Sequence, residues 1–282
     1  MPNRILKLIE DDAAIVDAAL KKYMSEKDSD YLKLFDAVEY SLFTGGKRIR
    51  PVLTLEFSRA LGGSIEAAVP YACAIEMIHT YSLIHDDMPC MDNDDYRRGK
   101  LTNHKVFGEA TALIAGDALL TKAFGVAAEN ANASDRQNIK AVEVLSRYAG
   151  MFGMIGGQQL DMEYETENAS FDRLIKMNSL KTACLIKAGC LLGCIAAGRT
   201  DEGTFNAAAA YAEGVGIAFQ ARDDLLDKGE DDEKTTFLTF LNESETEELI
   251  KKNTFEAISA VCGFDLNQNL SGIAEFLAYR DR

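Results

Sequence analysis

The sequence predicts a single all-α domain of about ten helices, and three observations support this. The strong helix formers Ala, Leu, Glu, Lys and Met dominate the 282 residues. All four prolines lie at or before Pro89, so the rest of the chain contains no residue that must interrupt a helix. Apolar residues recur three and four positions apart, as in Met77, Ile78 and Tyr81, whereas strand-like alternation is hard to find.

Turn signals divide the chain into these helices in order. Clusters rich in Gly, Pro, Asn, Asp and Ser stand at residues 44–46, 62–63, 89–98, 130–135, 168–170, 199–203 and 228–233. Between them the helical spacing returns, for example at Leu174, Met177 and Leu180. Apolar residues make up 47% of the chain, and neither a linker nor an internal repeat interrupts the pattern, so we expect one domain over residues 1–282.

The charge balance excludes several classes of partner. With 45 acidic and 30 basic residues the net charge is −15, which would repel nucleic acids and anionic membranes. Charges at Arg4, Lys7 and Glu10 break any signal-peptide run, and the charge-free stretches 148–160 and 188–198 are shorter than the roughly 20 residues of a bilayer crossing. Six cysteines without a C-x-x-C pair fit buried thiols in a reducing compartment. We therefore expect a cytoplasmic protein with no nucleic-acid or stable membrane partner.

Two acidic clusters are the candidate functional motifs. The first places five carboxylates within residues 86–95, directly before Arg97 and Arg98. The second occupies residues 219–227, where Asp223 and Asp227 are four apart and Gln220 precedes them by one turn, on one helical face. Either cluster alone would most often be a solvated acidic surface. Because both are surrounded by apolar residues, we expect them to border a cavity.

Ligands of this kind indicate a particular metal. Carboxylates without His or Cys favour Mg²⁺, which usually takes a few carboxylates together with the phosphate oxygens of a substrate. Cations that could hold a phosphate group lie at Lys47, Arg48 and Arg50, behind the pair Gly45–Gly46, although such a segment alone is often an ordinary loop.

Further polar residues are spaced to meet the same cavity. His79 stands seven residues before Asp86, two turns back on one helix face, and a packed core histidine is an equal alternative. Gly156–Gly157 precedes Gln158 and Asp161, and Lys181–Thr182 follows some twenty residues later. Glycines inside a helical pattern indicate either a close helix contact or room for a ligand.

Together these motifs resemble the trans-isoprenyl diphosphate synthases, the polyprenyl synthetase family, from about residue 36 to 241. In order they are G-G-K-R-I-R-P at 45–51, the aspartate motif with R-R-G at 86–99, G-x-x-G-G-Q-x-x-D at 153–161, K-T at 181–182 and F-Q-x-x-D-D-x-x-D at 219–227. Four residues separate Asp87 from Asp92, the longer form of the first motif that is found in bacterial farnesyl and in plant and bacterial geranylgeranyl diphosphate synthases. The resemblance implies an all-helical isoprenoid-synthase fold around a central cavity.

The resemblance also implies a site and a homodimer. Three Mg²⁺ ions would be held by Asp86, Asp87, Asp92, Asp223, Asp224 and Asp227. Isopentenyl diphosphate would contact Lys47, Arg50, His79 and Arg98, and the allylic diphosphate would contact Arg97, Lys181 and Gln220. Thr182 and Gln220 would present oxygen dipoles to the allylic carbocation that the isopentenyl double bond attacks.

One segment departs from the family pattern. The loop after the second motif is short: residues 228–237 keep the K-T-T-F end but lack the segment that carries an earlier G-K. Either Lys228 or Lys234 would then be the lysine that contacts diphosphate.

Tyr81 predicts the product. It lies five residues, roughly 7.5 Å, before Asp86 on a helix, so its ring would close the cavity along which the product grows. An aromatic residue at this place resembles the bacterial farnesyl synthases, which predicts farnesyl diphosphate. The alternative floor is Met77, one turn deeper.

Three alternatives remain open. One is a geranylgeranyl diphosphate synthase. A terpene cyclase would be expected to replace the second aspartate motif and to lack Lys47 and Arg50, both of which are present. A non-catalytic regulatory subunit would tend to lose aspartates or R-R-G, and this chain keeps them.

Overall fold

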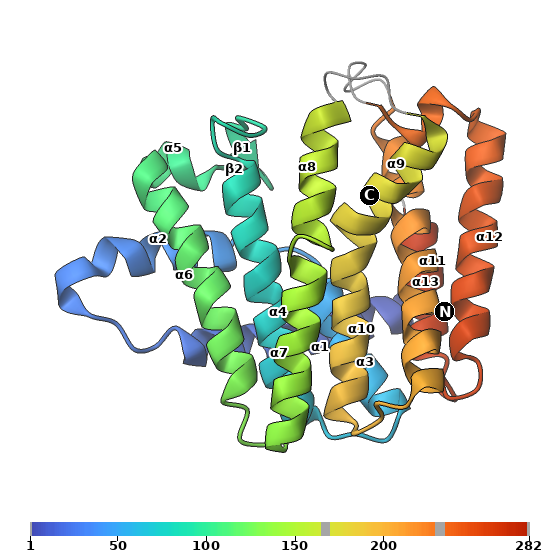
Figure 1. Cartoon of the computed structure of the whole chain (residues 1–282), viewed down its shortest axis with the longest axis horizontal. Helices are drawn as coiled ribbons and strands as arrows, with labels where there is room; N and C mark the ends of the chain where they lie inside the picture. Colours follow the sequence, from blue (N-terminus) through green and yellow to red (C-terminus); the bar gives the residue numbers. More distant parts are fainter. Residues whose placement is uncertain (1, 165–169, 229–234, 281–282) are drawn as a thin grey trace.

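The computed structural model describes residues 2–164, 170–228 and 235–280, and within them it confirms the all-α prediction (Figure 1). The helices are α1 (Pro2–Tyr23), α2 (Leu32–Leu42), α3 (Ile49–Ala60), α4 (Ile65–Asp86), α5 (Asn103–Phe107), α6 (Glu109–Ala128), α7 (Asp135–Ala149), α8 (Met154–Tyr164), α9 (Phe171–Asn178), α10 (Cys184–Ala196), α11 (Glu202–Leu226), α12 (Glu243–Val261) and α13 (Asn269–Ala278). Three shorter helical segments are η1 (Ser29–Tyr31), the π-helical η2 (Ser179–Ala183) and η3 (Phe237–Thr239). A two-residue antiparallel hairpin joins β1 (Tyr96–Arg97) to β2 (Lys100–Leu101).

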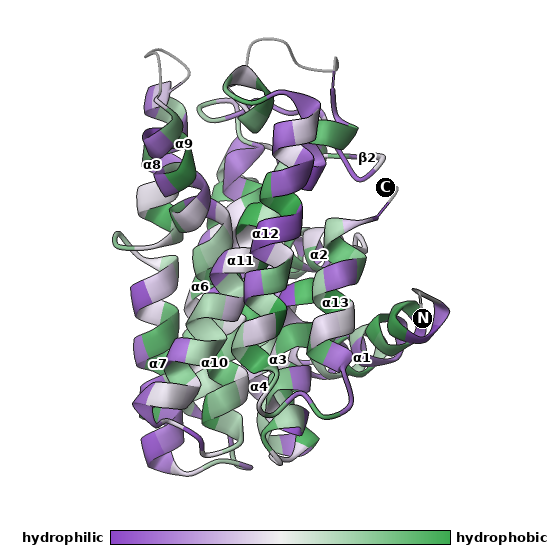
Figure 2. Cartoon of the chain, turned by 90° about the vertical axis from the view of Figure 1, so that its right-hand side faces the viewer, coloured by the Kyte–Doolittle hydropathy of each residue, from purple (hydrophilic) through white to green (hydrophobic). Residues whose placement is uncertain are grey.

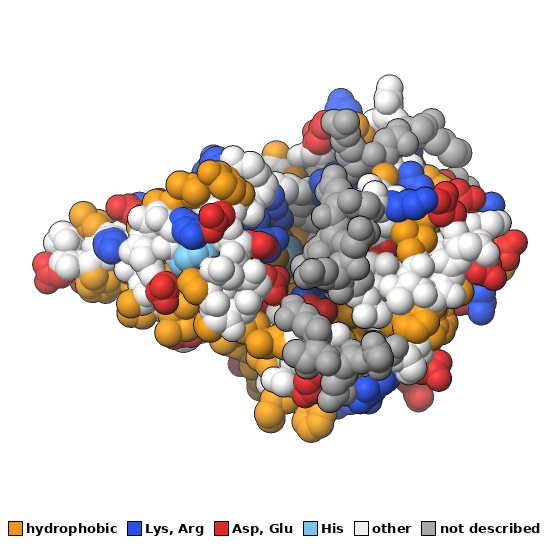
Figure 3. All heavy atoms as spheres, turned by 90° about the horizontal axis from the view of Figure 1, so that it is seen from above, with side chains coloured by type: hydrophobic (Ala, Val, Ile, Leu, Met, Phe, Trp, Pro, Cys, Tyr) orange, Lys and Arg blue, Asp and Glu red, His pale blue; other side chains and the backbone are white. Residues whose placement is uncertain are grey.

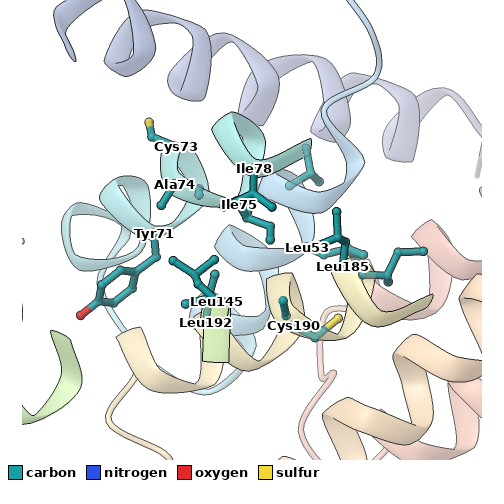
Figure 4. Close-up of a cluster of buried hydrophobic side chains, with 14 of the residues drawn as sticks. Leu53, Tyr71, Cys73, Ala74, Ile75, Ile78, Leu145, Leu185, Cys190 and Leu192 are labelled. Carbon is teal, nitrogen blue, oxygen red and sulfur yellow. The ribbon is translucent and has the colours of Figure 1, made fainter. Parts of the chain in front are cut away.

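Helix α4 is the central helix of the bundle. It packs against α3, α6 and α10, and apolar residues cover its whole circumference, so it is buried on every side along most of its length. The hydroxyl of Ser64 caps its start by accepting a hydrogen bond from the Ala67 amide at 3.1 Å. Figure 4 shows its side chains Tyr71, Ile75 and Ile78 in one cluster with residues of α3, α7 and α10. Whatever α4 carries at its end is therefore rigidly placed.

Helices α3 and α10 approach closely because α10 presents glycines to α3. A Cβ atom at Gly193 would stand 2.5 Å from the Thr54 carbonyl oxygen, and one at Gly189 would stand 2.8 Å from the Arg50 carbonyl oxygen. The Thr54 hydroxyl donates to the Gly189 carbonyl at 2.9 Å. This contact fixes the first turn of α3, which carries Arg50.

A buried charged network fastens α1 and α13 to α3. Arg59 on α3 donates to both carboxylate oxygens of Asp12 on α1, at 2.7 and 2.8 Å, and also pairs with Glu56. Asn269 at the start of α13 donates to the second oxygen of Glu56 at 2.6 Å. Since every buried carboxylate here has a partner, these helices are held by polar contacts as well as by the apolar core.

The structure has more helices than the roughly ten predicted, because several breaks carry weak turn signals. Gly108, with φ of 87°, separates α5 from α6, and residues 150–153 separate α7 from α8. The hairpin begins within the predicted turn at 89–98 and ends at Leu101, just after it. Its strands are too short to show strand periodicity.

Two helical stretches have the length and hydropathy of a membrane span, Glu109–Ala128 and Phe171–Ala196. Neither stretch is free of charge, because isolated charged residues interrupt both. The second stretch is largely buried inside the bundle, as a core helix is, whereas the first keeps a larger exposed share.

Both aspartate motifs lie at one end of the bundle. Helices α4 and α11 run upward in Figure 1 and end at Asp86 and Leu226, and the side view shows β2 of the hairpin at this same end (Figure 2). The surface there is hollowed, with basic and acidic side chains gathered along the hollow (Figure 3).

Candidate active site

The first aspartate motif is a compact turn at the end of α4. After Asp86 and Asp87 the chain turns back, and the amide of Asp92 donates to the Asp86 carbonyl at 2.9 Å. Asn93, with φ of 54°, continues the turn through a hydrogen bond to Met88. The four residues between Asp87 and Asp92 thus bring Asp92 back beside Asp86, so both carboxylates belong to one site.

Burial disfavours the ionised form of these carboxylates. It raises the pKa of Asp86 to about 6, where Lys181 opposes the shift and Asp92 adds to it. Burial likewise raises the pKa of Asp87 to about 6, against the effect of Arg97, whose Nε donates to the Asp87 carboxylate at 2.5 Å. The motif therefore accumulates more negative charge than nearby cations neutralise.

The hairpin that carries Arg97 and Arg98 is fixed to α2. The Tyr40 hydroxyl donates to the Leu101 carbonyl at 2.7 Å, and the Asn103 amide donates to the Ala37 carbonyl at 2.7 Å. Arg98 reaches across to the basic loop, where it donates to the Gly45 carbonyl.

Lys181 connects the first motif to α8. It forms an ion pair with Asp161, and its pKa is raised despite burial, because Asp161, Asp86 and Asp92 all favour its charged form. It lies in the π-helical segment η2, and the Gly157 backbone packs so closely on Lys181 that a Cβ atom would clash. The close-contact interpretation is thereby confirmed for Gly157, and Lys181 and Thr182 of the irregular turn line the cavity.

The second motif is the last turn of α11, and it differs from the predicted arrangement in one respect. Gln220, Asp224 and Asp227 line the cavity together, whereas Asp223 forms an ion pair with Arg280. Asp224 accepts a hydrogen bond from Gln220 at 3.1 Å and another from the amide of Phe237 at 2.7 Å. Burial raises the pKa values of both Asp223 and Asp224.

A cavity of about 520 Å³ lies between the two motifs. Its polar wall includes Asp92, Asp161, Asp224, Asp227 and Lys181. Its apolar wall is formed by Tyr164, Leu174, Met177 and Leu238. A cavity with one strongly charged wall and one apolar wall fits a molecule that has an anionic head and a hydrocarbon tail.

Arg48 organises the basic loop from within the core. Only 4% of its surface is exposed, its φ is 50°, and its guanidinium donates to Glu76 at 2.6 Å, to Asp17 at 3.0 Å and to the Leu42 carbonyl. The residues on either side, Lys47 and Arg50, are therefore held at the start of α3.

The basic cluster consists of Lys47, Arg50, Arg98 and His79, and its positive charge is not fully neutralised. Burial, with Glu76 opposing it and Arg98 adding to it, lowers the pKa of Arg50 to about 10, so the guanidinium stays charged. Burial and the neighbouring Arg50 and Arg98 hold the pKa of His79 well below its usual range, so the imidazole is neutral. Among the described residues the buried Nε of Arg50 has no hydrogen-bond partner. Gathered cations with an orphaned donor are what an anion site requires.

The donor set fits magnesium in one particular way. Among the residues that the structure describes, no three Asp, Glu, His or Cys side chains converge closely enough to hold an ion by themselves. The available donors are carboxylate oxygens divided between two motifs. This is the arrangement expected when phosphate oxygens of a substrate complete the coordination.

Most predicted site residues meet at this end of the bundle. Lys234 lies outside the described residues, and Tyr81 is buried beside the motif without lining the cavity. Sequence reasoning missed the core role of Arg48, the contact of Arg280 with Asp223, and the apolar wall at Leu174 and Met177. Arg280 has no sequence signal, since its partner lies 57 residues earlier in the chain.

Comparisons with known proteins agree with this geometry. The sequence model of the polyprenyl synthetase family matches residues 32–236. The chain is 42% identical over 237 residues to a farnesyl diphosphate synthase of Bacillus subtilis, covering 83% of this chain and 79% of that one. It is 39% identical over 290 residues to a heterodimeric geranylgeranyl pyrophosphate synthase large subunit of Arabidopsis thaliana, covering 95% and 77%. The structure of an FPP/GFPP synthase from Zymomonas mobilis superposes with a TM-score of 0.93 at 33% identity, covering 99% and 100%.

The raised pKa values predict how magnesium affects stability. Between about pH 4 and pH 6 folded Asp86 and Asp87 hold protons that the unfolded chain has released, so the metal-free protein loses this stability as pH rises through that window. Mg²⁺ binds the ionised form and should reverse the loss. We expect 10 mM Mg²⁺, a concentration of about the order needed for saturation, to raise the melting temperature much more at pH 7.5 than at pH 5.

Asp86→Asn is the matched variant for this measurement. Without metal it should be more stable than wild type at pH 7.5, by up to about 3 kcal/mol, and by roughly half as much at pH 5. An Mg²⁺ effect of the same size at both pH values would contradict the assignment.

Proposed function

Because the chain belongs to the polyprenyl synthetase family, we propose that it condenses isopentenyl diphosphate with dimethylallyl or geranyl diphosphate to give farnesyl diphosphate. The observation that carries the proposal is the division of charge at one end of the bundle. A basic cluster lies beside two aspartate motifs, and an apolar cavity wall adjoins both. Two diphosphates with hydrocarbon tails need this combination.

The basic cluster would bind isopentenyl diphosphate. Lys47, Arg50 and Arg98 are charged, and neutral His79 can donate one hydrogen bond without adding a further charge. Burial lowers the pKa of each of these groups, and neighbouring arginines lower it further, so a bound diphosphate would relieve the repulsion. Its own charge changes little in the reaction, which makes this a binding subsite.

The aspartate motifs would hold three Mg²⁺ ions together with the allylic diphosphate. Asp86, Asp92 and Asp223 are the proposed direct ligands, with Asp87, Asp224 and Asp227 in support. For Asp223 this requires that Arg280 release the carboxylate that it pairs with in the structure. When bound, Mg²⁺ would stabilise the negative charge that develops on the allylic diphosphate as its carbon–oxygen bond breaks. The charges of Lys181 and Arg97 both act on Asp86, and both cations would contact the phosphate groups held there.

The remaining chemistry needs dipoles and an enclosed space. Thr182 and Gln220 line the cavity, and Gln220 uses its amide nitrogen on Asp224, which leaves its carbonyl oxygen available to an allylic cation. The isopentenyl double bond then attacks, and the departed diphosphate accepts the proton that is lost. No covalent bond to the protein forms.

Lys228 is the better candidate for the lysine of the shortened loop. It lines the cavity and forms an ion pair with Glu243, and both side chains are largely exposed, so the pair exchanges easily for a phosphate.

The proposed fifteen-carbon product rests on the place of Tyr81 five residues before Asp86, and Tyr81 itself lies outside the lining of the cavity. Its ring is buried below Asp86, packed edge-to-face on His85 at 5.7 Å, and its hydroxyl has no hydrogen-bond partner within the described residues. Burial and the nearby Asp86 raise its pKa to about 12, so it stays a neutral aromatic barrier. Geranylgeranyl diphosphate is the alternative product, since geranylgeranyl synthases are among the relatives.

A homodimer is proposed from the exposed apolar surface. Leu113 and Ile114 on α6 are 46% and 52% exposed, and Ile139 on α7 is 64% exposed. Met151 and Phe152, between α7 and α8, are 78% and 81% exposed. Helices α6, α7 and α8 are neighbours, so these side chains form an apolar face of the kind that associates.

Turnover tests the proposed activity. The protein is incubated with isopentenyl diphosphate, each allylic primer and Mg²⁺, and the products are separated by chromatography. We expect farnesyl diphosphate, complete loss of activity with EDTA, and a decrease of about 10³-fold or more in Asp86→Ala. Activity that survives EDTA would refute the magnesium assignment, and no turnover with any primer would favour a regulatory subunit.

Chain length tests Tyr81. Tyr81→Ala should shift the main product to twenty carbons or beyond while ionisation of the primer continues, because the metal and diphosphate contacts are untouched. Tyr81→Phe is the matched control: it keeps the ring and removes a hydroxyl without a partner, so its product should not change. A shift with Met77→Ala and none with Tyr81→Ala would move the floor one turn deeper.

Light scattering tests the dimer. The wild-type protein should have about twice the chain mass of 30.9 kDa. Ile114→Glu together with Phe152→Glu should yield monomers of unchanged helix content, because a charge buried in an apolar interface is costly. A wild-type species of 30.9 kDa would overturn the proposal.

A further inference from the structure

Arg280, the last described residue, reaches into the second aspartate motif. Its guanidinium forms an ion pair with Asp223 and stacks over the Phe219 ring, 3.9 Å from the ring centroid. It also donates to the Leu277 carbonyl at 2.6 Å, while Arg222 donates to the backbone carbonyl of Arg280 at 2.9 Å. Only 7% of its surface is exposed. Three contacts thus hold the side chain and a fourth holds its backbone, and three of the four are with α11.

The ion pair between Arg280 and Asp223 would compete with a metal ion for the same carboxylate. Asp223 Oδ1 accepts the hydrogen bond from Arg280, and a metal ligand must offer its oxygen lone pairs to the ion. A guanidinium and a divalent cation cannot occupy the same face of one carboxylate, and they also repel each other. Within the described residues no arginine forms an ion pair with Asp86 or Asp92. The cations near Asp86 are Lys181, which pairs with Asp161, and Arg97, which pairs with Asp87.

We propose that Arg280 is a built-in counter-ion of Asp223 that metal must displace, so that it sets the metal affinity of the second motif. This rests on the proposed function, since it assumes that Asp223 is a metal ligand. In the metal-free protein Arg280 neutralises a carboxylate that burial would otherwise leave uncompensated. When metal binds, the guanidinium leaves Asp223 and the last turn of α13 loses one of its anchors.

The displaced guanidinium stays close to the basic cluster. The Nζ atom of Lys47 lies over the ring of Phe276 on α13, 5.8 Å from its centroid. The charges of Arg280 and Asp223 both act on the pKa of Lys47. The pKa of Lys47 is lowered by burial and by Arg280, so the two cations already repel each other. Metal binding at Asp223 therefore changes the surroundings of the isopentenyl diphosphate subsite through Arg280.

Metal affinity tests the proposal without any enzyme assay. Mn²⁺ is titrated without substrate into four proteins, wild type, Arg280→Gln, Asp223→Asn and the double variant, and free Mn²⁺ is counted by electron paramagnetic resonance. Removing the competitor should tighten Mn²⁺ binding about tenfold in Arg280→Gln, the effect of one charge-assisted hydrogen bond. In the Asp223→Asn background the same substitution should have no effect, because Arg280 acts through that carboxylate. Arg199→Gln, at an exposed arginine distant from the motifs in sequence, controls for the change in net charge.

Each outcome has a defined meaning. Equal Mn²⁺ affinity in wild type and Arg280→Gln, or an effect that persists with Asp223→Asn, overturns the proposal. Wild type that binds no Mn²⁺, even with pyrophosphate present, instead overturns the proposed metal site. If Arg280→Gln does not fold, hydrogen exchange of wild type decides: Mn²⁺ should increase exchange at residues 277–280, and unchanged or slower exchange there contradicts displacement.

Discussion

The repulsion among carboxylates and diphosphates is the constraint on which this structure depends. A chain of charge −15 that binds two polyanions must supply compensating cations locally, because its overall field opposes both ligands. The proposed function assigns this compensation to two separate groups, the basic cluster near the start of α3 and the divalent metal that the aspartates would bind. The raised pKa values of Asp86 and Asp87 and the lowered pKa of Arg50 have one main cause, because burial disfavours the charged form of each group.

The rigid core of the bundle holds these buried charged groups in place. Helix α4 is buried on every side and delivers Asp86 to a fixed point, and the glycine contacts of α10 lock the first turn of α3. The buried Arg48 pairs with the buried Glu76 and with the partly exposed Asp17, which fixes the backbone next to Lys47 and Arg50. Asp224 ties the segment after the second motif to α11 through the Phe237 amide. Function at one end of the bundle is thus supported by packing along its whole length.

Sequence could predict what depends on local pattern. Helical spacing and the positions of proline predicted the fold class, and the two aspartate clusters predicted that their side chains share one site. It could not show that Asp224 rather than Asp223 faces the cavity, since rotation of a helix by one residue depends on what α11 packs against. Nor could it find Arg48 as a core residue, because a buried arginine with a positive φ and three hydrogen-bond partners has no signature in composition or spacing. The apolar wall at Leu174 and Met177 looked like ordinary helix packing for the same reason.

The central claim is that protein cations hold one diphosphate and metal holds the other. Calorimetric titration of each ligand with and without Mg²⁺ tests it most directly, using isopentenyl diphosphate and a non-ionisable thiolodiphosphate analogue of geranyl diphosphate. Isopentenyl diphosphate should bind in EDTA with an affinity that Lys47→Ala weakens, whereas the allylic analogue should bind only when Mg²⁺ is present. Tight binding of the allylic analogue in EDTA, or an absolute Mg²⁺ requirement for isopentenyl diphosphate, would contradict this division.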